Sequence, residues 1–429
     1  MARAIELADA AVERHRTGGD ERGAARSRVL KARGMSGGGR YDAARAEVSA
    51  ALEVLSVDPD LDTVEALRIL AQSYTFTGNR VEGMRIISEA LVLGQALDVG
   101  PRELASLFNA KGVAASMENR SAEAIAYFET AARLAERAGD FGTVAVAQLN
   151  LASELSSRDA GAAERVARSA VEHGRRTGVR RVLGTAVANL CVALVEQGKW
   201  DEAGDVVRQA LDEDHLDGAV VHWASGFLDA LRGDVERARA SLDAAASAGT
   251  TQAVQDQASL DLLAALVCLG TGEHVGELER AEAVLAQRDE LGIGFETQRW
   301  AWPLAARAAR RLGRTETLDE LAAMLDAHPI GHLPRVLRAE RRLLEGLRAA
   351  DVQDPRADEL LDEAITELRD VGNPYQLAHG LADVAEARAR RHIGAAELLD
   401  EVAEIARRLG CAPLAERARA IVPVAADER

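Results

Sequence analysis

The sequence predicts an all-α solenoid, an array of antiparallel helix pairs stacked one after another. Three observations support this. Small residues recur with a period of about 40 residues. Hydrophobic residues make up 48% of the chain but aromatic residues only 3%, a composition typical of helices rather than strands. The 429 residues also exceed what a single globular core needs.

The period is carried by a helical segment, here called helix B, with two small residues seven positions apart. The second small residue is Ala11, Ala51, Ala90, Ala131, Ala170, Ala210 and Ala245, with successive spacings of 40, 39, 41, 39, 40 and 35 residues. The first is Ala4, Ala44, Gly83, Ala124, Ala163, Ala203 and Ala238. Residues seven apart share a helix face, so each helix B offers a neighbour two points of close approach.

A turn signal precedes most of these segments, as in Gly78-Asn79-Arg80 and Gly198-Lys199-Trp200. Before each turn lies another helical segment, helix A, with its own periodic apolar face. The predicted unit is therefore helix A, a tight turn, helix B and a longer connection, and about ten such pairs can be followed along the chain.

Two of these units resemble the tetratricopeptide repeat. The residues that carry the resemblance are Leu67, Leu70, Ala71 and Tyr74 followed by Gly83, Ile87 and Ala90, and Phe108 and Gly112 followed by Ala124, Phe128 and Ala131. The period is longer than the usual length of about 34 residues and is similar to that of a long-period variety in large bacterial regulators. The resemblance implies a right-handed superhelix whose A helices line the concave face.

We expect two parts, a regular array over residues 1–250 that starts at a helix B, and less regular helix pairs with a C-terminal capping helix over residues 251–429. The stretches 291–294 and 328–334 contain glycine or proline and are predicted bends. We expect Pro303 to lie in a first helical turn, with Trp300 and Trp302 closing the bend before it. Because the chain starts halfway through a unit, we expect a larger parent protein or another chain to cover that end.

Charge and cysteine content restrict the partners and the compartment. The formal net charge is -17 and the sequence pI about 5.1, which disfavours direct binding of nucleic acid. The three cysteines are widely spaced in apolar context, so we expect neither a disulfide framework nor a metal site. With no signal peptide and no long uncharged apolar run, the chain is expected to be cytoplasmic, soluble and free of membrane contact.

No motif predicts catalysis, so we expect no enzyme activity, no catalytic residue, no cofactor and no metal. The glycine-rich residues 34–39 lack the lysine of a phosphate loop and are interpreted as a flexible turn. His328 and His332 are separated by proline and glycine and are interpreted as loop residues. The acidic run 212–218 lacks the oxygen ligands of a calcium loop.

Amide side chains recur on helix A and form the predicted binding site. They are Gln72, Asn109, Gln148, Asn150 and Asn189. Asn is a poor helix former, so its recurrence in mid-helix requires a reason. The family resemblance implies that Asn109, Asn150 and Asn189 form a ladder that binds the backbone of an extended segment. The alternative is that these amides hydrogen-bond between neighbouring A helices.

Residues 359–364 and 405–418, with Gly372-Asn373-Pro374 between them, resemble the C-terminal end of the helical sensor arm in large signal-transducing ATPases of the STAND class. These include LuxR-type regulators related to the maltose activator and ATPase-coupled adenylate cyclases. The resemblance implies a sensor or regulatory arm for a protein, a peptide or a small effector, with the ATPase, cyclase or DNA-binding module in the same chain or a separate one. The alternatives are a free-standing adaptor that bridges two proteins and, third, a helical-repeat enzyme such as a phosphatase.

Overall fold

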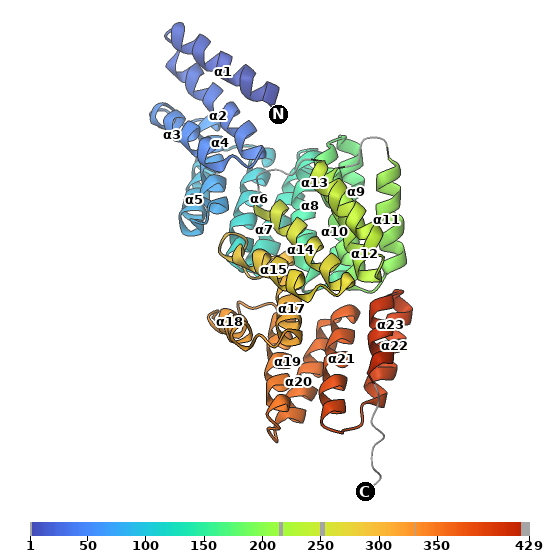
Figure 1. Ribbon diagram of the computed structural model, residues 1–429. Coiled ribbons are helices and arrows are strands. Elements are labelled where there is room, and N and C mark those ends of the chain that lie inside the picture. Colours follow the sequence, from blue (N-terminus) through green and yellow to red (C-terminus); the bar gives the residue numbers. More distant parts are fainter. Residues whose placement is uncertain (1, 214–217, 249–253, 330, 422–429) are drawn as a thin grey trace.

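The computed structural model describes residues 2–213, 218–248, 254–329 and 331–421. These residues form 23 α-helices and no strand (Figure 1). The predicted all-α class is therefore confirmed. Apart from α1, the short α16 and the terminal α23, the helices form ten antiparallel pairs, in agreement with the repeat count.

The first region comprises α1 to α13. Helix α1 (Ala2–Thr17) contains Ala4 and Ala11, and its assignment as a helix B stays a prediction. The pairs that follow are α2 (Glu21–Gly37) with α3 (Tyr41–Leu55), α4 (Leu61–Phe76) with α5 (Arg80–Ala96), α6 (Pro101–Met117) with α7 (Ser121–Arg137), α8 (Phe141–Ser156) with α9 (Ala160–Thr177), α10 (Arg180–Glu196) with α11 (Trp200–Asp212), and α12 (Ala219–Arg232) with α13 (Val235–Ser247).

The second region comprises α14 to α23. Its pairs are α14 (Val254–Thr271) with α15 (His274–Ala286), α17 (Glu296–Arg311) with α18 (Thr315–Asp326), α19 (Arg335–Asp351) with α20 (Ala357–Val371), and α21 (Pro374–Arg390) with α22 (Ala396–Leu409). The four-residue α16 (Arg288–Leu291) precedes the predicted bend at 291–294, and α23 (Ala412–Ala420) packs on α22 and α21 at the end of the array.

The periodic small residues of helix B are contact points in the core. Ala44, Ala51, Ala124 and Ala131, among others, are fully buried. Helix A contributes small residues as well, because a Cβ atom on Gly112 would lie 2.5 Å from the ring of Phe128. The sequence period therefore records where neighbouring backbones approach each other.

The array curves with its A helices on the inner side. Each A helix packs against the next A helix, from α2 through α21, whereas among the described residues no B helix packs against the next B helix to a comparable extent. Side chains that point away from the pair on an A helix therefore face the inside of the curve.

The curve brings the part of the second region from α17 onward beneath the first region, where α17, α21 and α23 meet the A-to-B turns of earlier pairs (Figure 1). A Cβ atom on Gly198 would lie 2.9 Å from Pro374, and one on Gly233 would lie 2.6 Å from Pro413. Both glycines also have a positive φ, so only glycine fits both the turn and the contact. We call this junction the seam.

Polar contacts cross the same seam. Nη2 of Arg299 in α17 donates to Oγ of Ser156 at 3.0 Å and to Oε1 of Glu196 at 3.3 Å. Sγ of Cys411 donates to the carbonyl of Leu231 at 3.1 Å. Asn119 accepts from the backbone N–H of Gly294 at 3.0 Å. The bend at 291–294 is thus held against the turn after α6.

Two local predictions were wrong. Residues 34–37 belong to helix α2, because Met35 is buried in the core and Ser36 bonds to Gln72 in α4, so tertiary contacts outweigh the helix cost of glycine. Pro303 lies inside α17, which begins at Glu296, so it is not in the first turn. Trp300 and Trp302 are buried on that helix.

Part of the acidic run, residues 214–217, lies outside the described residues.

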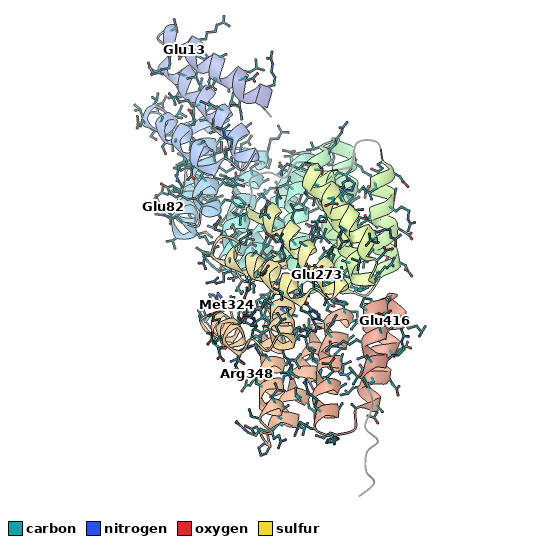
Figure 2. The ribbon with its side chains drawn as sticks, in the orientation of Figure 1. Glu13, Glu82, Glu273, Met324, Arg348 and Glu416 are labelled. Atoms are coloured by element: carbon teal, nitrogen blue, oxygen red, sulfur yellow. The ribbon has the colours of Figure 1, made fainter. Side chains whose placement is uncertain are left out.

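Charged side chains cover the outside of the array, including the exposed Glu13, Glu273 and Glu416 (Figure 2). No helix in the described part of the chain combines the length and hydropathy that a bilayer crossing requires.

Candidate binding face

The inner face of α6, α8 and α10 carries Asn109, Asn150 and Asn189, one on each helix and at matching levels. We call these three residues the amide row. Nδ2 of Asn150 donates to Oδ1 of Asn109 at 3.0 Å, and Nδ2 of Asn189 donates to the carbonyl of Leu149 at 2.8 Å. The row therefore links three successive A helices, as expected from the alternative that these amides hydrogen-bond between neighbouring A helices.

Hydrogen bonds between the helices do not use all the polar atoms of the row. Among the described residues, Nδ2 of Asn109 and the Oδ1 atoms of Asn150 and Asn189 have no hydrogen-bond partner. None of these three atoms is among the polar atoms that are both unpartnered and fully buried. These three atoms therefore reach solvent. They comprise one amide donor group and two acceptors, the two kinds of group that pair with a peptide backbone.

The other two predicted amides lie elsewhere. Oε1 of Gln72 in α4 accepts from Ser36 at 3.2 Å and from Arg68 at 3.4 Å, so it joins α2 to α4 on the inner face. Gln148 contacts helix α9, where its Nε2 donates to Ser169 at 3.0 Å and its Oε1 lies 3.0 Å from Nδ1 of His173. The structure thus separates Gln148 from the amide row.

Helix α10 exposes a single polar stripe. Every residue of α10 is buried except Arg180, Arg181, Thr185 and Asn189. Arg181, Thr185 and Asn189 are spaced four apart, which places them along one face of the helix. Sequence reasoning singled out Asn189 alone, although three polar residues at this spacing in an otherwise apolar helix are a signal for the other two.

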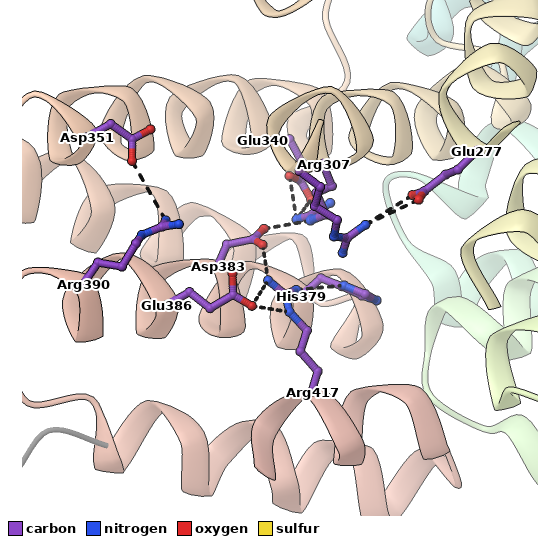
Figure 3. Close-up of polar contacts among 10 residues, drawn as sticks. Glu277, Arg307, Glu340, Asp351, His379, Asp383, Glu386, Arg390 and Arg417 are labelled. Atoms are coloured by element: carbon purple, nitrogen blue, oxygen red, sulfur yellow. Dashed lines mark hydrogen bonds and ion pairs between the residues drawn. The ribbon is translucent and has the colours of Figure 1, made fainter. Parts of the chain in front are cut away.

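The inner face of the second region is different, because ionised side chains occupy it (Figure 3). Arg307 in α17 donates from Nε to Asp383 in α21 at 2.7 Å and from Nη2 to Glu340 in α19 at 3.0 and 2.9 Å. Arg417 in α23 donates to the other oxygen of Asp383 at 2.6 Å and to Glu386 at 2.8 Å. We call these five residues the charge cluster.

Burial and charge act in opposite directions on the acids of the charge cluster. Burial would raise the pKa of Asp383, but Arg307 and Arg417 together hold the pKa of this carboxyl well below its usual range. Burial raises the pKa of Glu340, which has only Arg307 to oppose it. Burial, together with Arg307 and Arg417, lowers the pKa of the neighbouring His379 well below its ordinary value, so this imidazole is neutral at pH 7.

A pocket adjoins the charge cluster, between α14, α15, α17 and α21. Its space is about 340 Å³ including the open mouth, and its walls include Trp300, Leu304, Arg307, Tyr375 and His379. Glu277 lies at one end, where it is fully buried and bonded to His274 at 2.9 Å. Arg307 in the pocket wall is engaged with carboxylates of α19 and α21, so it holds these helices together.

The described residues contain no group of three or more His, Cys, Asp or Glu side chains placed to hold a metal ion. Burial raises the pKa of Cys191 to about 12 and that of Cys411 to about 11, so both are thiols at neutral pH. The arrangement is suited to hydrogen-bonded recognition along the amide row and to structural pairing in the charge cluster.

The fold and the inner face together define a solenoid of tetratricopeptide-like helix pairs. No family model matches the chain, and no curated protein sequence does. Solved structures do match. NprR in complex with its cognate peptide NprX is 12% identical, with a TM-score of 0.50 over 78% of this chain and 98% of NprR.

Human IFIT1, solved as a dimer with m7Gppp-AAAA, is 15% identical, with a TM-score of 0.50 over 92% of this chain and 90% of IFIT1. The apo form of RapI is 13% identical, with a TM-score of 0.48 over 61% of this chain and 97% of RapI. These proteins are helical repeat proteins of the tetratricopeptide type. The likeness to NprR and IFIT1 supports the predicted fold, and the STAND and LuxR resemblance stays a prediction.

Proposed function

We propose that the chain is a non-enzymatic binding scaffold whose inner face at α6 to α10 holds an extended segment of a partner protein or a peptide. The amide row is the observation that carries this proposal. It presents a free donor group and two free acceptors on three successive helices, and one A-helix spacing of 8–10 Å corresponds to about three residues of extended chain.

The similar fold of NprR, solved with a peptide, is consistent with a peptide ligand but does not identify one for this chain. We further propose that the scaffold is the sensor or regulatory arm of a signal-transduction or transcription regulator. The resemblance of residues 359–364 and 405–418 to such arms motivates this step. A coding sequence for an ATPase, cyclase or DNA-binding module, fused to or beside that of this chain, would support it, and a partner with none of these would favour an adaptor.

Selection of random linear peptides displayed on phage, with the purified chain as bait, tests the binding role. We expect peptides that bind the wild-type chain and bind the Asn150→Ala/Asn189→Ala variant about tenfold more weakly, since two hydrogen bonds of about 0.5–1.5 kcal/mol each are lost. The control is Gln95→Ala, which removes an exposed amide from helix α5 outside the row. Failure to recover any peptide, or equal binding by the row variant, would overturn the proposal.

A further inference from the structure

Three arginines stand at the end of the α10 stripe, where α9 runs into α10. Arg176, Arg180 and Arg181 are all exposed, and among the described residues none of them forms an ion pair. We call them the arginine rim. The neighbouring Arg175 differs, because it pairs with Glu213 at 2.6 Å. The rim is a local excess of positive charge on a chain whose net charge is -17.

The surroundings hold part of the rim in place. The guanidinium of Arg176 lies over the ring of Phe141 at 3.9 Å from its centroid, and the other partner of that ring is His173, with the two ring centroids 5.8 Å apart. A flat guanidinium on an aromatic face keeps its donors available at its edge. No acidic residue lies in the first turn of α10 to neutralise Arg180 or Arg181.

The rim is continuous with the amide row. Arg181, Thr185 and Asn189 form the exposed stripe of α10, so a segment lying on Asn189 reaches Arg181 within three helical turns along the same face. Through Arg181, the rim therefore borders the inner face of α10. The charge of Arg181 also opposes the rise that burial causes in the pKa of Tyr41 of α3, while Asp256 of α14 adds to that rise.

We infer that the arginine rim selects a partner segment with acidic side chains, so that Asp or Glu pairs with Arg176, Arg180 and Arg181 while the segment's backbone lies on the amide row. This inference rests on the proposed function and adds the class of partner to it. Unpaired guanidinium groups bind carboxylates through charge-assisted hydrogen bonds, and charged groups at the border of an interface set its specificity.

A protein partner fits the charges better than a nucleic acid. A phosphate backbone requires many cations along its length. Three unpaired arginines on a chain of net charge -17 supply a local site for a few carboxylates and repel a long polyanion elsewhere.

The test measures preference for charge, with matched variants. A fluorescein-labelled peptide of alternating Glu and Ser and its Gln-Ser counterpart serve as probes alongside the peptides selected above. We expect the wild-type chain to bind the Glu peptide about tenfold more tightly at low salt, a preference that rising salt reduces. The Arg180→Gln/Arg181→Gln variant is expected to lose the preference.

The matched control is Arg335→Gln/Arg338→Gln, because these arginines are also exposed in the first turn of a helix, α19, but lie in the second region. This variant changes the net charge equally and is expected to keep the preference. The inference is overturned if Arg180→Gln/Arg181→Gln still prefers the Glu peptide. It is also overturned if the wild-type chain binds a single-stranded RNA more tightly than the Glu peptide and this variant loses the RNA binding.

The two proposals fail separately. If Asn150→Ala/Asn189→Ala weakens peptide binding but Arg180→Gln/Arg181→Gln keeps the preference for the Glu peptide, the binding role stands and only the acidic class of partner is excluded. Equal binding by the row variant removes the binding role itself, whatever the charge of the peptide.

Discussion

The two regions of the molecule repeat the same helix pair but bury different polar groups. Before residue 196, the buried polar residues of the described chain are all serines or threonines: Ser27, Ser36, Thr63, Ser73, Thr75 and Ser156. From that point on, ionisable side chains are buried as well. They are Glu196 at the end of α10 and, in the second region, Asp261, Glu277, Arg299, Glu340 and Asp383.

The difference follows from what each group needs as a partner. The hydroxyls of Ser73 and Thr75 donate to carbonyls four residues earlier in the same helix, at 2.9 Å each. A buried charge requires an opposite charge, which its own helix rarely supplies. Arg307 therefore fixes α17, α19 and α21 relative to one another, whereas the first region leaves its inner face half-exposed for the amide row.

The largest expected effect comes from breaking the charge cluster. Arg307→Met leaves the buried Glu340 without its cation and Asp383 with Arg417 alone, so we expect the free energy of unfolding to fall by about 3–5 kcal/mol. Chemical denaturation measures this. The control Arg208→Met breaks an exposed pair with Asp205, whose side chains are 69% and 70% exposed, and is expected to change almost nothing.

Adding Glu340→Met to Arg307→Met removes the orphaned acid and is expected to recover much of the loss. If Arg307→Met costs no more than the surface control, the two regions do not differ in the way we describe.

A second experiment compares two glutamates of the first region over a range of pH. Burial raises the pKa of Glu196 at the seam to about 8, despite Arg299, and its Oε2 has no partner. The folded state thus binds this proton more tightly than the unfolded chain, and stability falls as pH rises from about 4.5 to about 8. Glu196→Gln should remove the fall and stabilise the protein at pH 9 by on the order of 2–4 kcal/mol.

Glu164 is the matched control, with the opposite sign. Burial would raise its pKa, but Lys199, Arg168 and Gln197 lower it to about 2. Its contribution is present above the unfolded pKa and is lost as pH falls towards 2. Glu164→Gln should therefore destabilise the protein at neutral pH and lose its effect in acid. Thermal unfolding at several pH values measures both, and equal signs for the two variants would contradict the assigned environments.

The smallest expected effect concerns the amide row. Asn150→Ala removes a hydrogen bond between half-exposed side chains, so we expect the free energy of unfolding to change by no more than about 1 kcal/mol. A double-mutant cycle with Asn109→Ala measures the coupling between the two amides. A loss above about 2 kcal/mol would mean that the row is chiefly structural, and the contrast between an open and a filled inner face would weaken.

Much of the fold could be predicted, because the repeat consists of small residues such as Ala124 and Ala131, and contacts within one unit require these residues to be small. The amide row could be proposed because Asn109, Asn150 and Asn189 recur with that same period. The charge cluster could not, because Arg307, Glu340 and Asp383 are spaced 33 and 43 residues apart and match no period. Among 69 acidic and 52 basic residues, no pattern marks these three.

The sequence by itself determined the helix pairs, their turns and the residues at which they touch, since each unit must bury one apolar face against the next. Only the tertiary structure decided that the array curves until α17, α21 and α23 meet the turns of earlier pairs, and that Arg307 meets two acids from other helices. Curvature accumulates from small rotations at every contact, so it places residues far apart in the chain side by side, and no local pattern encodes that sum.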